Sequence, residues 1–181
     1  GEADANRNPF VRADLPNLRA LLGGHVLTNG TPRFSDHHVS FVPTDACLGV
    51  HGCPQSATGQ AIIVTGLNVP RLTGKHWGPK PDVEIQRIVR SDNLLLPLAN
   101  SDHSLKLTNA YPPKFFDAIN SGMRSYSALQ PAFVTAGIAL YTDDDLRDGR
   151  AYSADFTTGV FHTVPKVSVA PLYSLRECGR M

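Results

Sequence analysis

Three aspartates in one short segment are the residues of this chain best suited to hold a metal ion. Asp143, Asp145 and Asp148 lie in the run Thr142–Arg150, with Gly149 behind them. Calcium takes several oxygen ligands from carboxylates and carbonyls on a loop, and it would offset the repulsion between these neighbouring carboxylates. The spacing D-x-D-x-x-D-G differs from the calcium-loop pattern of ligands at alternate positions followed by a late Glu. The segment is therefore either a calcium site or a solvated acidic turn at the tip of a hairpin.

The cysteines suggest a second constellation. Cys47 and Cys53 bracket the residues LGVHG, a loop short enough to be closed by a disulfide. This predicted disulfide leaves Cys178 odd, which in a secreted protein points to a bond with another chain. Alternatively, all three thiols are reduced, as is usual inside cells. His51 completes C-x-x-x-H-x-C, which is not a usual zinc-binding spacing, so we do not expect zinc here.

Catalytic signatures are absent from the sequence. His38-Val39-Ser40-Phe41 resembles half of the signature of the two-histidine phosphoesterases, in which two such motifs face each other. Neither His103 nor His162 is followed by a hydroxyl residue two positions on, so the second half is missing. There is no G-x-S-x-G elbow and no glycine-rich phosphate loop. We therefore expect a protein that is not an enzyme, with a small hydrolase as an alternative.

Three segments resemble, in their order along the chain, the small calcium-dependent galactose-binding lectins of bacteria. In that family a loop after a late strand supplies the calcium ligands that also hold the sugar. The resemblance implies that Trp77 offers a stacking face and that the acidic turn holds the cation. Trp77 and Tyr141 are accordingly the predicted ligand-binding residues, although Arg150 and Ala151 stand near the place where the family has a pair of Asn residues. The three segments are Ile62–Gly66, Lys75–Asp82 and Gly137–Asp145.

Period-2 alternation around residue 138 predicts the elements that would position these groups. Apolar side chains recur at every second position from Val134 to Leu140, which is typical of a strand with one buried face. A second strand is predicted over 152–157, so the two would form a hairpin. Two short helices are predicted over Asp14–Leu22 and Pro113–Asn120. Further strands are predicted over 37–42, 61–69, 82–89, 94–98, 104–108 and 167–169.

These elements predict a mainly β fold, an antiparallel β-sandwich or jelly-roll-like barrel with one or two short peripheral helices. The chain has 181 residues, of which 18% are charged, together with 15 Gly and 14 Pro, a composition that favours many turns. Residues 1–13 are expected to form an extended N-terminal arm, and residues 14–181 a single β-rich domain. No apolar run approaches the roughly 20 residues that a membrane span requires.

The formal net charge of +1 and the lack of a basic run argue against nucleic-acid binding. Arms and neutral β-rich chains suit symmetric assemblies, so we expect protein partners and a homo-oligomer or larger assembly. The predicted function is that of a non-enzymatic structural or assembly protein, namely a virion, tail or other particle component or a secreted adaptor. The alternative is a calcium-assisted carbohydrate-binding module. An extracellular or particle location is favoured over a cytoplasmic one, and the cofactor is none or Ca²⁺.

Overall fold

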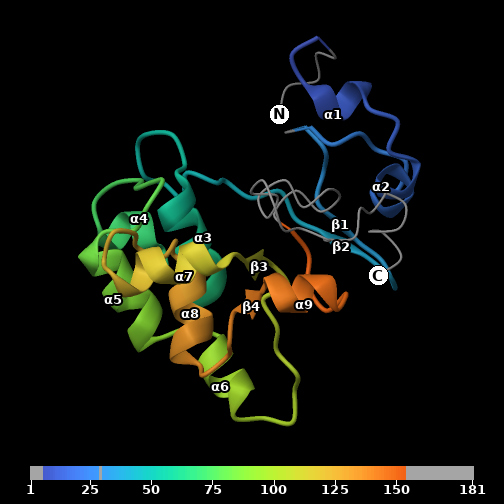
Figure 1. Cartoon of the computed structure of the whole chain (residues 1–181). Helices are drawn as coiled ribbons and strands as arrows, with labels where there is room; N and C mark the ends of the chain where they lie inside the picture. Colours follow the sequence, from blue (N-terminus) through green and yellow to red (C-terminus); the bar gives the residue numbers. More distant parts are fainter. Residues whose placement is uncertain (1–5, 29, 154–181) are drawn as a thin grey trace. The chain divides into compact units, whose positions relative to one another are not determined.

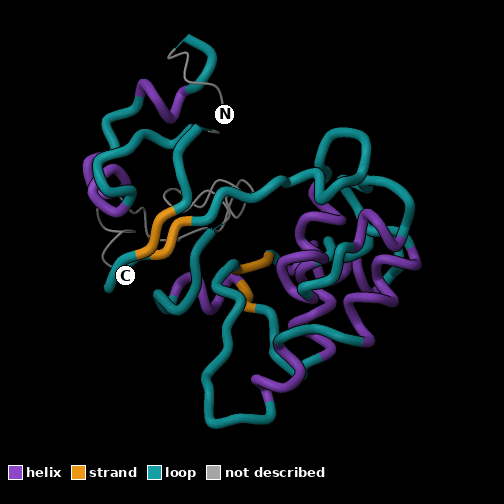
Figure 2. The backbone as a smooth tube through the Cα atoms, turned by 180° about the vertical axis from the view of Figure 1, so that it is seen from behind, coloured by secondary structure: helices purple, strands orange, loops and turns teal. Residues whose placement is uncertain are grey.

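Helices dominate the part of the chain that the computed structural model describes, residues 6–28 and 30–153 (Figure 2). Four strands of two residues each accompany them. The helices in this part are α1 (Pro9–Arg12), α2 (Pro16–Leu21), α3 (Ser56–Thr65), α4 (Val69–Leu72), α5 (Val83–Ser91), α6 (Leu95–Ala99), α7 (Pro113–Asn120), α8 (Leu129–Thr135) and α9 (Asp143–Arg147). The strands are β1 (Phe34–Ser35), β2 (Ser40–Phe41), β3 (Ala110–Tyr111) and β4 (Tyr141–Thr142).

The predicted β-sandwich or jelly-roll-like barrel is therefore wrong. The described residues hold only two-stranded sheets, β1 with β2 antiparallel and β3 with β4 parallel. The function built on that sandwich, a structural or assembly protein of a particle, loses its basis with it, and so do the alternatives that depended on β-strand loops. Residues 154–157 of the predicted strand 152–157, and the whole of the predicted strand 167–169, lie outside the described residues.

The region around residue 138 shows why alternation misled the prediction. Helix α8 runs to Thr135, and the chain then reverses at Gly137, whose φ of 76° is accessible to glycine at little cost. The backbone N–H of Ile138 donates to the carbonyl of Phe133 at 3.0 Å, which closes the end of the helix. The apolar residues that alternate in sequence are thus divided between a helix, its cap and a short connection to β4.

Two further predicted strands are helices as well. Residues 61–65 of the run 61–69 form the second half of α3, which ends where the N–H of Gly66 donates to the carbonyl of Ile62 at 2.8 Å, and Val69 begins α4. The run 82–89 forms α5, and the side chain of Asp82 caps it by accepting from the N–H of Ile85 at 2.9 Å. The predicted strand 94–98 overlaps α6, whereas 104–108 lies in no helix or strand. The predicted helices at 14–22 and 113–120 are confirmed by α2 and α7.

The chain divides into two compact units, residues 1–46 and residues 47–181. The first unit contains α1, α2 and the β1–β2 hairpin, in which the rings of Phe34 and Phe41 stack with centroids 5.8 Å apart. Leu22 is the one apolar side chain that is buried among its described residues. Helix α1 lies within the predicted arm of residues 1–13, and the arm and the single domain of residues 14–181 stay predictions.

The second unit is built around the mutual packing of α3, α5 and α8 (Figure 1). Its largest core cluster joins buried side chains from all three helices, and Ile85, Val89 and Ala61 have no exposed surface. A second cluster centres on Leu107, Phe115 and Leu140 beside α7. The third cluster, Ala110, Leu146 and Ala151, packs α9 against the β3–β4 pair.

Candidate functional site

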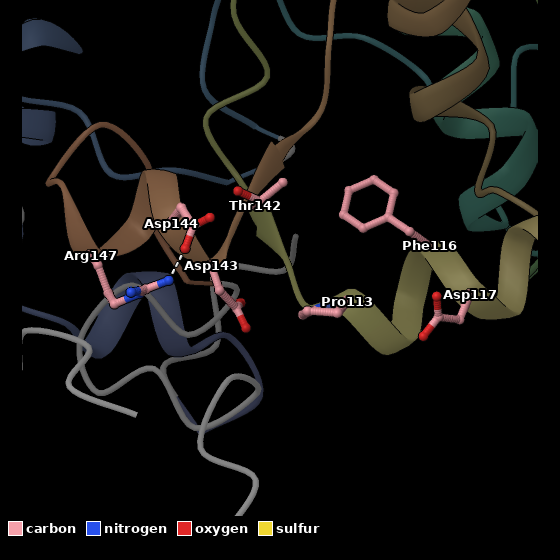
Figure 3. A pocket seen from close by; sticks show the side chains of 7 residues that line it. All are labelled: Pro113, Phe116, Asp117, Thr142, Asp143, Asp144 and Arg147. Atoms are coloured by element: carbon pink, nitrogen blue, oxygen red, sulfur yellow. Dashed lines mark ion pairs between the residues drawn. The ribbon is translucent and has the colours of Figure 1, made fainter. Parts of the chain in front are cut away.

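Two cavities of the second unit are large enough to hold a small molecule. The first, called here the acidic pocket, has a volume of about 590 Å³ and lies between α7 on one side and β4 with α9 on the other (Figure 3). Figure 3 shows the ring of Phe116 on the same side as Asp117, opposite the carboxylates of Asp143 and Asp144. The lining residues are Pro113, Phe116, Asp117, Thr142, Asp143, Asp144 and Arg147.

The three predicted calcium ligands have different surroundings and hydrogen-bond partners in the structure. Asp143 lines the acidic pocket. Asp145 is the third residue of α9, and its carboxylate accepts from the backbone N–H of Thr142 at 2.8 Å and from its hydroxyl at 3.0 Å. Asp148 follows the helix, and its carboxylate accepts from the guanidinium of Arg150 at 2.8 Å. Arg150 also pairs with Asp145, at 2.6 Å.

Arginines and helix capping therefore offset the carboxylate repulsion that suggested calcium. The hydrogen bond from the backbone N–H of Thr142 is the main reason why the pKa of Asp145 lies below its ordinary value. A second arginine, Arg147, forms an ion pair with Asp144 across one turn of the helix. Within residues 6–28 and 30–153, no three His, Cys, Asp or Glu side chains are grouped as metal ligands. Calcium binding by Asp143, Asp145 and Asp148 stays a prediction.

The two predicted sugar-binding aromatics belong to different core clusters. Trp77 is half-buried against the α3–α5–α8 cluster, and the ammonium of Lys75 lies 4.0 Å from the centroid of its ring. That contact occupies a face of the indole that stacking on a sugar would need. Tyr141 is half-buried in the third cluster, beside Leu146. The structure does not bring the pair together, and their role in binding stays a prediction.

The cysteine loop is held by backbone contacts. The thiol of Cys47 donates to the carbonyl of Gly52 at 3.6 Å. The side chain of Asn68 donates to the carbonyl of Leu48 at 3.0 Å and so ties the loop to the start of α4. The predicted disulfide itself stays a prediction.

The second cavity, called here the Gln60 pocket, has a volume of about 500 Å³. Pockets of a few hundred cubic ångströms with an apolar lining and a few convergent polar groups are typical of small-molecule sites. This one combines aromatic rings, amide groups and two cations. Its lining residues are Gln60, Asn109, Ala110, Tyr111, Pro112, Lys114, Phe115, Arg124, Ser127, Leu129 and Gln130.

Gln60 brings an unsatisfied acceptor to this pocket from the middle of α3. Its Oε1 atom is buried and accepts no hydrogen bond from the described part of the chain. The second glutamine, Gln130 at the start of α8, is 8% exposed, and both the oxygen and the nitrogen of its amide are hydrogen-bonded. Its Oε1 accepts from the N–H of Ser127 at 2.7 Å and from the Ser127 hydroxyl, and its Nε2 donates to the hydroxyl of Tyr111 at 3.1 Å.

Aromatic rings and positive charge complete the pocket. The rings of Tyr111 and Phe115 stack with centroids 4.5 Å apart, and the guanidinium of Arg124 lies 5.0 Å from the centroid of Phe115. Lys114, in the first turn of α7, adds a second cation. Burial is the main reason why the pKa of Tyr111 lies above its ordinary value, against the smaller opposing effects of the Gln130 bond and of Arg124. No Asp or Glu is among the lining residues, so the net charge of the lining is positive.

Sequence reasoning missed the Gln60 pocket because none of its residues forms a motif. One signal was present: Gln60 and Gln130 each interrupt an otherwise apolar helical run, TGQAIIV and ALQPAFV. A glutamine in such a run is seldom buried unless its amide is hydrogen-bonded to the protein or serves to bind a ligand.

Comparisons with protein-family models, with curated protein sequences and with solved structures found no match to this chain.

Proposed function

We propose that the helical unit of residues 47–153 binds a small organic acid that also carries an N–H or O–H donor, and that it does so in the Gln60 pocket. The observation that carries this proposal is the buried Oε1 atom of Gln60, which accepts no hydrogen bond within the described residues. A buried acceptor without a partner costs roughly 1–3 kcal/mol. A ligand donor that reaches Gln60 recovers that free energy, and this favours ligands with an N–H or O–H group.

The positive lining supports an acidic group on the same ligand. Arg124 and Lys114 both line the pocket, and both are exposed, so an anion is attracted before it enters. Carboxylates pair with guanidinium groups through charge-assisted hydrogen bonds, which are stronger than neutral ones. The stacked rings of Tyr111 and Phe115 add an apolar wall against which a flat ligand can pack.

Calorimetric titration with three matched probes tests the proposal. 4-Aminobenzoate has both an acid group and a donor, benzoate lacks the donor, and aniline lacks the acid group. We expect the wild type to bind 4-aminobenzoate several-fold more tightly than either of the others. In Gln60→Leu the advantage of 4-aminobenzoate over benzoate is expected to disappear, because the side chain no longer accepts the ligand's N–H.

Gln86→Leu is the matched control, because Gln86 on α5 bonds to the carbonyl of Pro81 and does not line the pocket. This variant is expected to keep the wild-type preference. Absence of binding by the wild type at millimolar concentration would overturn the proposal, and so would a Gln60→Leu variant with an unchanged preference for 4-aminobenzoate.

The other expectations about function are not decided by this pocket. In the described part of the chain, no helix combines the length and apolar character needed to cross a membrane. Protein partners, including a homo-oligomer, stay a prediction, as do the absence of enzymatic activity and the extracellular or particle location. Exposed apolar side chains on α3, α4 and α5 are compatible with such a partner, namely Ile63, Leu72 and Val83.

A further inference from the structure

The hydroxyl group of Tyr111 is the feature of the Gln60 pocket whose hydrogen bonding is most fully defined. Gln130 donates to it through Nε2 at 3.1 Å. The amide of Gln130 cannot be reversed without loss, because its Oε1 already accepts from both the N–H and the hydroxyl of Ser127. Ser127 and Gln130 thus fix the direction of the bond: Tyr111 is the acceptor in it.

A phenolic hydroxyl that accepts one hydrogen bond still has its own proton to donate. In residues 6–28 and 30–153, Gln130 is the one side chain bonded to this hydroxyl. Because Tyr111 lines the pocket, its O–H is available to donate to a ligand atom there. That atom must be an acceptor, which fits a carboxylate better than an amine or a hydrocarbon.

The ring that carries this hydroxyl is held in place on two sides. Its backbone belongs to β3, where Tyr111 pairs in register with Thr142 of β4. Its face stacks on Phe115, and the edge of Phe116 meets it with centroids 6.4 Å apart. A donor that is positioned before the ligand arrives loses little entropy on binding. The phenol keeps its proton at neutral pH, because the ordinary pKa of tyrosine is 10.0 and burial raises the pKa of Tyr111 above that value.

We infer that Tyr111 is the residue that selects acids in this pocket, because its hydroxyl, oriented by Gln130 and Ser127, donates a hydrogen bond to the carboxylate of the ligand beside Arg124. This inference rests on the proposed function and deepens it. Tyr111 distinguishes a carboxylate from its uncharged amide isostere because an O–H bond to an ionised oxygen is roughly twice as strong as one to a neutral oxygen.

The test compares 4-aminobenzoate with 4-aminobenzamide, which keeps the ring and the donor but replaces the acid by a neutral amide. In the wild type we expect the acid to bind more tightly. In Tyr111→Phe the affinity for the acid is expected to fall by about 10-fold or more, and that for the amide by less. Tyr126→Phe is the matched control, since Tyr126 also contacts Phe115 but does not line the pocket.

A second measurement keeps the test decisive if Tyr111→Phe folds poorly. In wild-type protein with ¹³C at the tyrosine Cζ position, the Tyr111 resonance is expected to shift on addition of 4-aminobenzoate and to shift less with 4-aminobenzamide. The inference on Tyr111 is overturned if a folded Tyr111→Phe variant keeps the wild-type ratio of affinities for acid and amide, or if the Tyr111 resonance shifts equally with both probes. In either case the proposed function still stands if Gln60→Leu loses the preference for 4-aminobenzoate. Failure of the wild type to bind 4-aminobenzoate overturns both.

Discussion

The side chain of Asp145 bonds to a residue before α9 and to a residue after it. Its carboxylate accepts from the N–H of Thr142 as part of a capping box at the start of α9. It also accepts from the Thr142 hydroxyl and pairs with Arg150 beyond the end of that helix. The side chain is 14% exposed, so these bonds are partly shielded from water. Removing a capping side chain typically costs about 0.5–2 kcal/mol. We expect Asp145→Ala to lower the free energy of unfolding by about 1 kcal/mol in a urea titration.

Asp144→Ala is the control for this prediction. Asp144 lies in the same turn of α9 and forms an ion pair with Arg147, but its side chain is 74% exposed. Exposed pairs of this kind contribute little to stability. If the two variants lose the same amount of stability, capping is not the role of Asp145.

The contribution of Asp145 also has a defined dependence on pH. Its pKa in the folded chain lies below the ordinary value of 3.8, because the ionised form accepts the hydrogen bonds of Thr142. A carboxyl group whose pKa is lower in the folded than in the unfolded state stabilises the fold fully at pH values above its unfolded-state pKa. That stabilisation is lost as the pH falls through its folded-state pKa. The difference in unfolding free energy between wild type and Asp145→Asn is therefore expected to be full at neutral pH and to vanish in strong acid.

At the residue scale, sequence reasoning identified the acidic segment as notable but not which of its carboxylates pair with which neighbours. The spacing of Asp143, Asp145 and Asp148 is visible in the sequence, whereas the engagement of Arg147 and Arg150 depends on the segment being helical. Gln60 and Gln130 come from separate helices, and only the packing of those helices brings them to one cavity. No local pattern could have predicted that.

At the scale of elements, local sequence signals predicted the short helices α2 and α7 but not the helices α3 and α5 of the core. The proline that opens Pro113–Asn120 predicted α7 correctly. Helix α5 was misread because Val83 and Ile85 alternate, although Ile85 and Val89 also have helical spacing and Asp82 is a good N-cap. Short apolar runs rich in Val and Ile fit both periods, so only the tertiary packing separates a strand from a helix there.

Matched substitutions in α5 test whether burial in this segment follows the helical period of 3.6 residues or the strand period of 2. Ile85 is completely buried in the core cluster, whereas Val83 two positions earlier is 82% exposed. Ile85→Ala is expected to lower the free energy of unfolding by about 2–5 kcal/mol, because it removes buried methyl groups and leaves a cavity. Val83→Ala is expected to change it by less than about 0.5 kcal/mol, because surface substitutions away from special features have small effects. A strand with one buried face would place both side chains on the same side, and the two losses would then be similar.

At the scale of the whole molecule, the sequence argued against a membrane span but did not reveal two units. Glycine and proline were taken as a sign of many turns between strands, and in the structure several of them cap short helices instead: Gly66 ends α3, and Pro113 opens α7. The boundary between residues 46 and 47 has no linker composition. It follows from the distribution of long-range contacts, which a single sequence does not display.

The three core clusters are drawn entirely from the second unit, between residues 57 and 151. The first unit, by contrast, buries one apolar side chain among its described residues, Leu22. The fragment of residues 47–181 is therefore expected to retain its helical circular dichroism and to unfold cooperatively at the same urea concentration as the full chain. The fragment of residues 1–46 is expected to show no cooperative transition, because chains of this length rarely bury enough apolar surface to fold alone. A clear drop in the midpoint for 47–181 would mean that residues 1–46 stabilise the helical unit directly, as expected if residues 14–181 form a single domain.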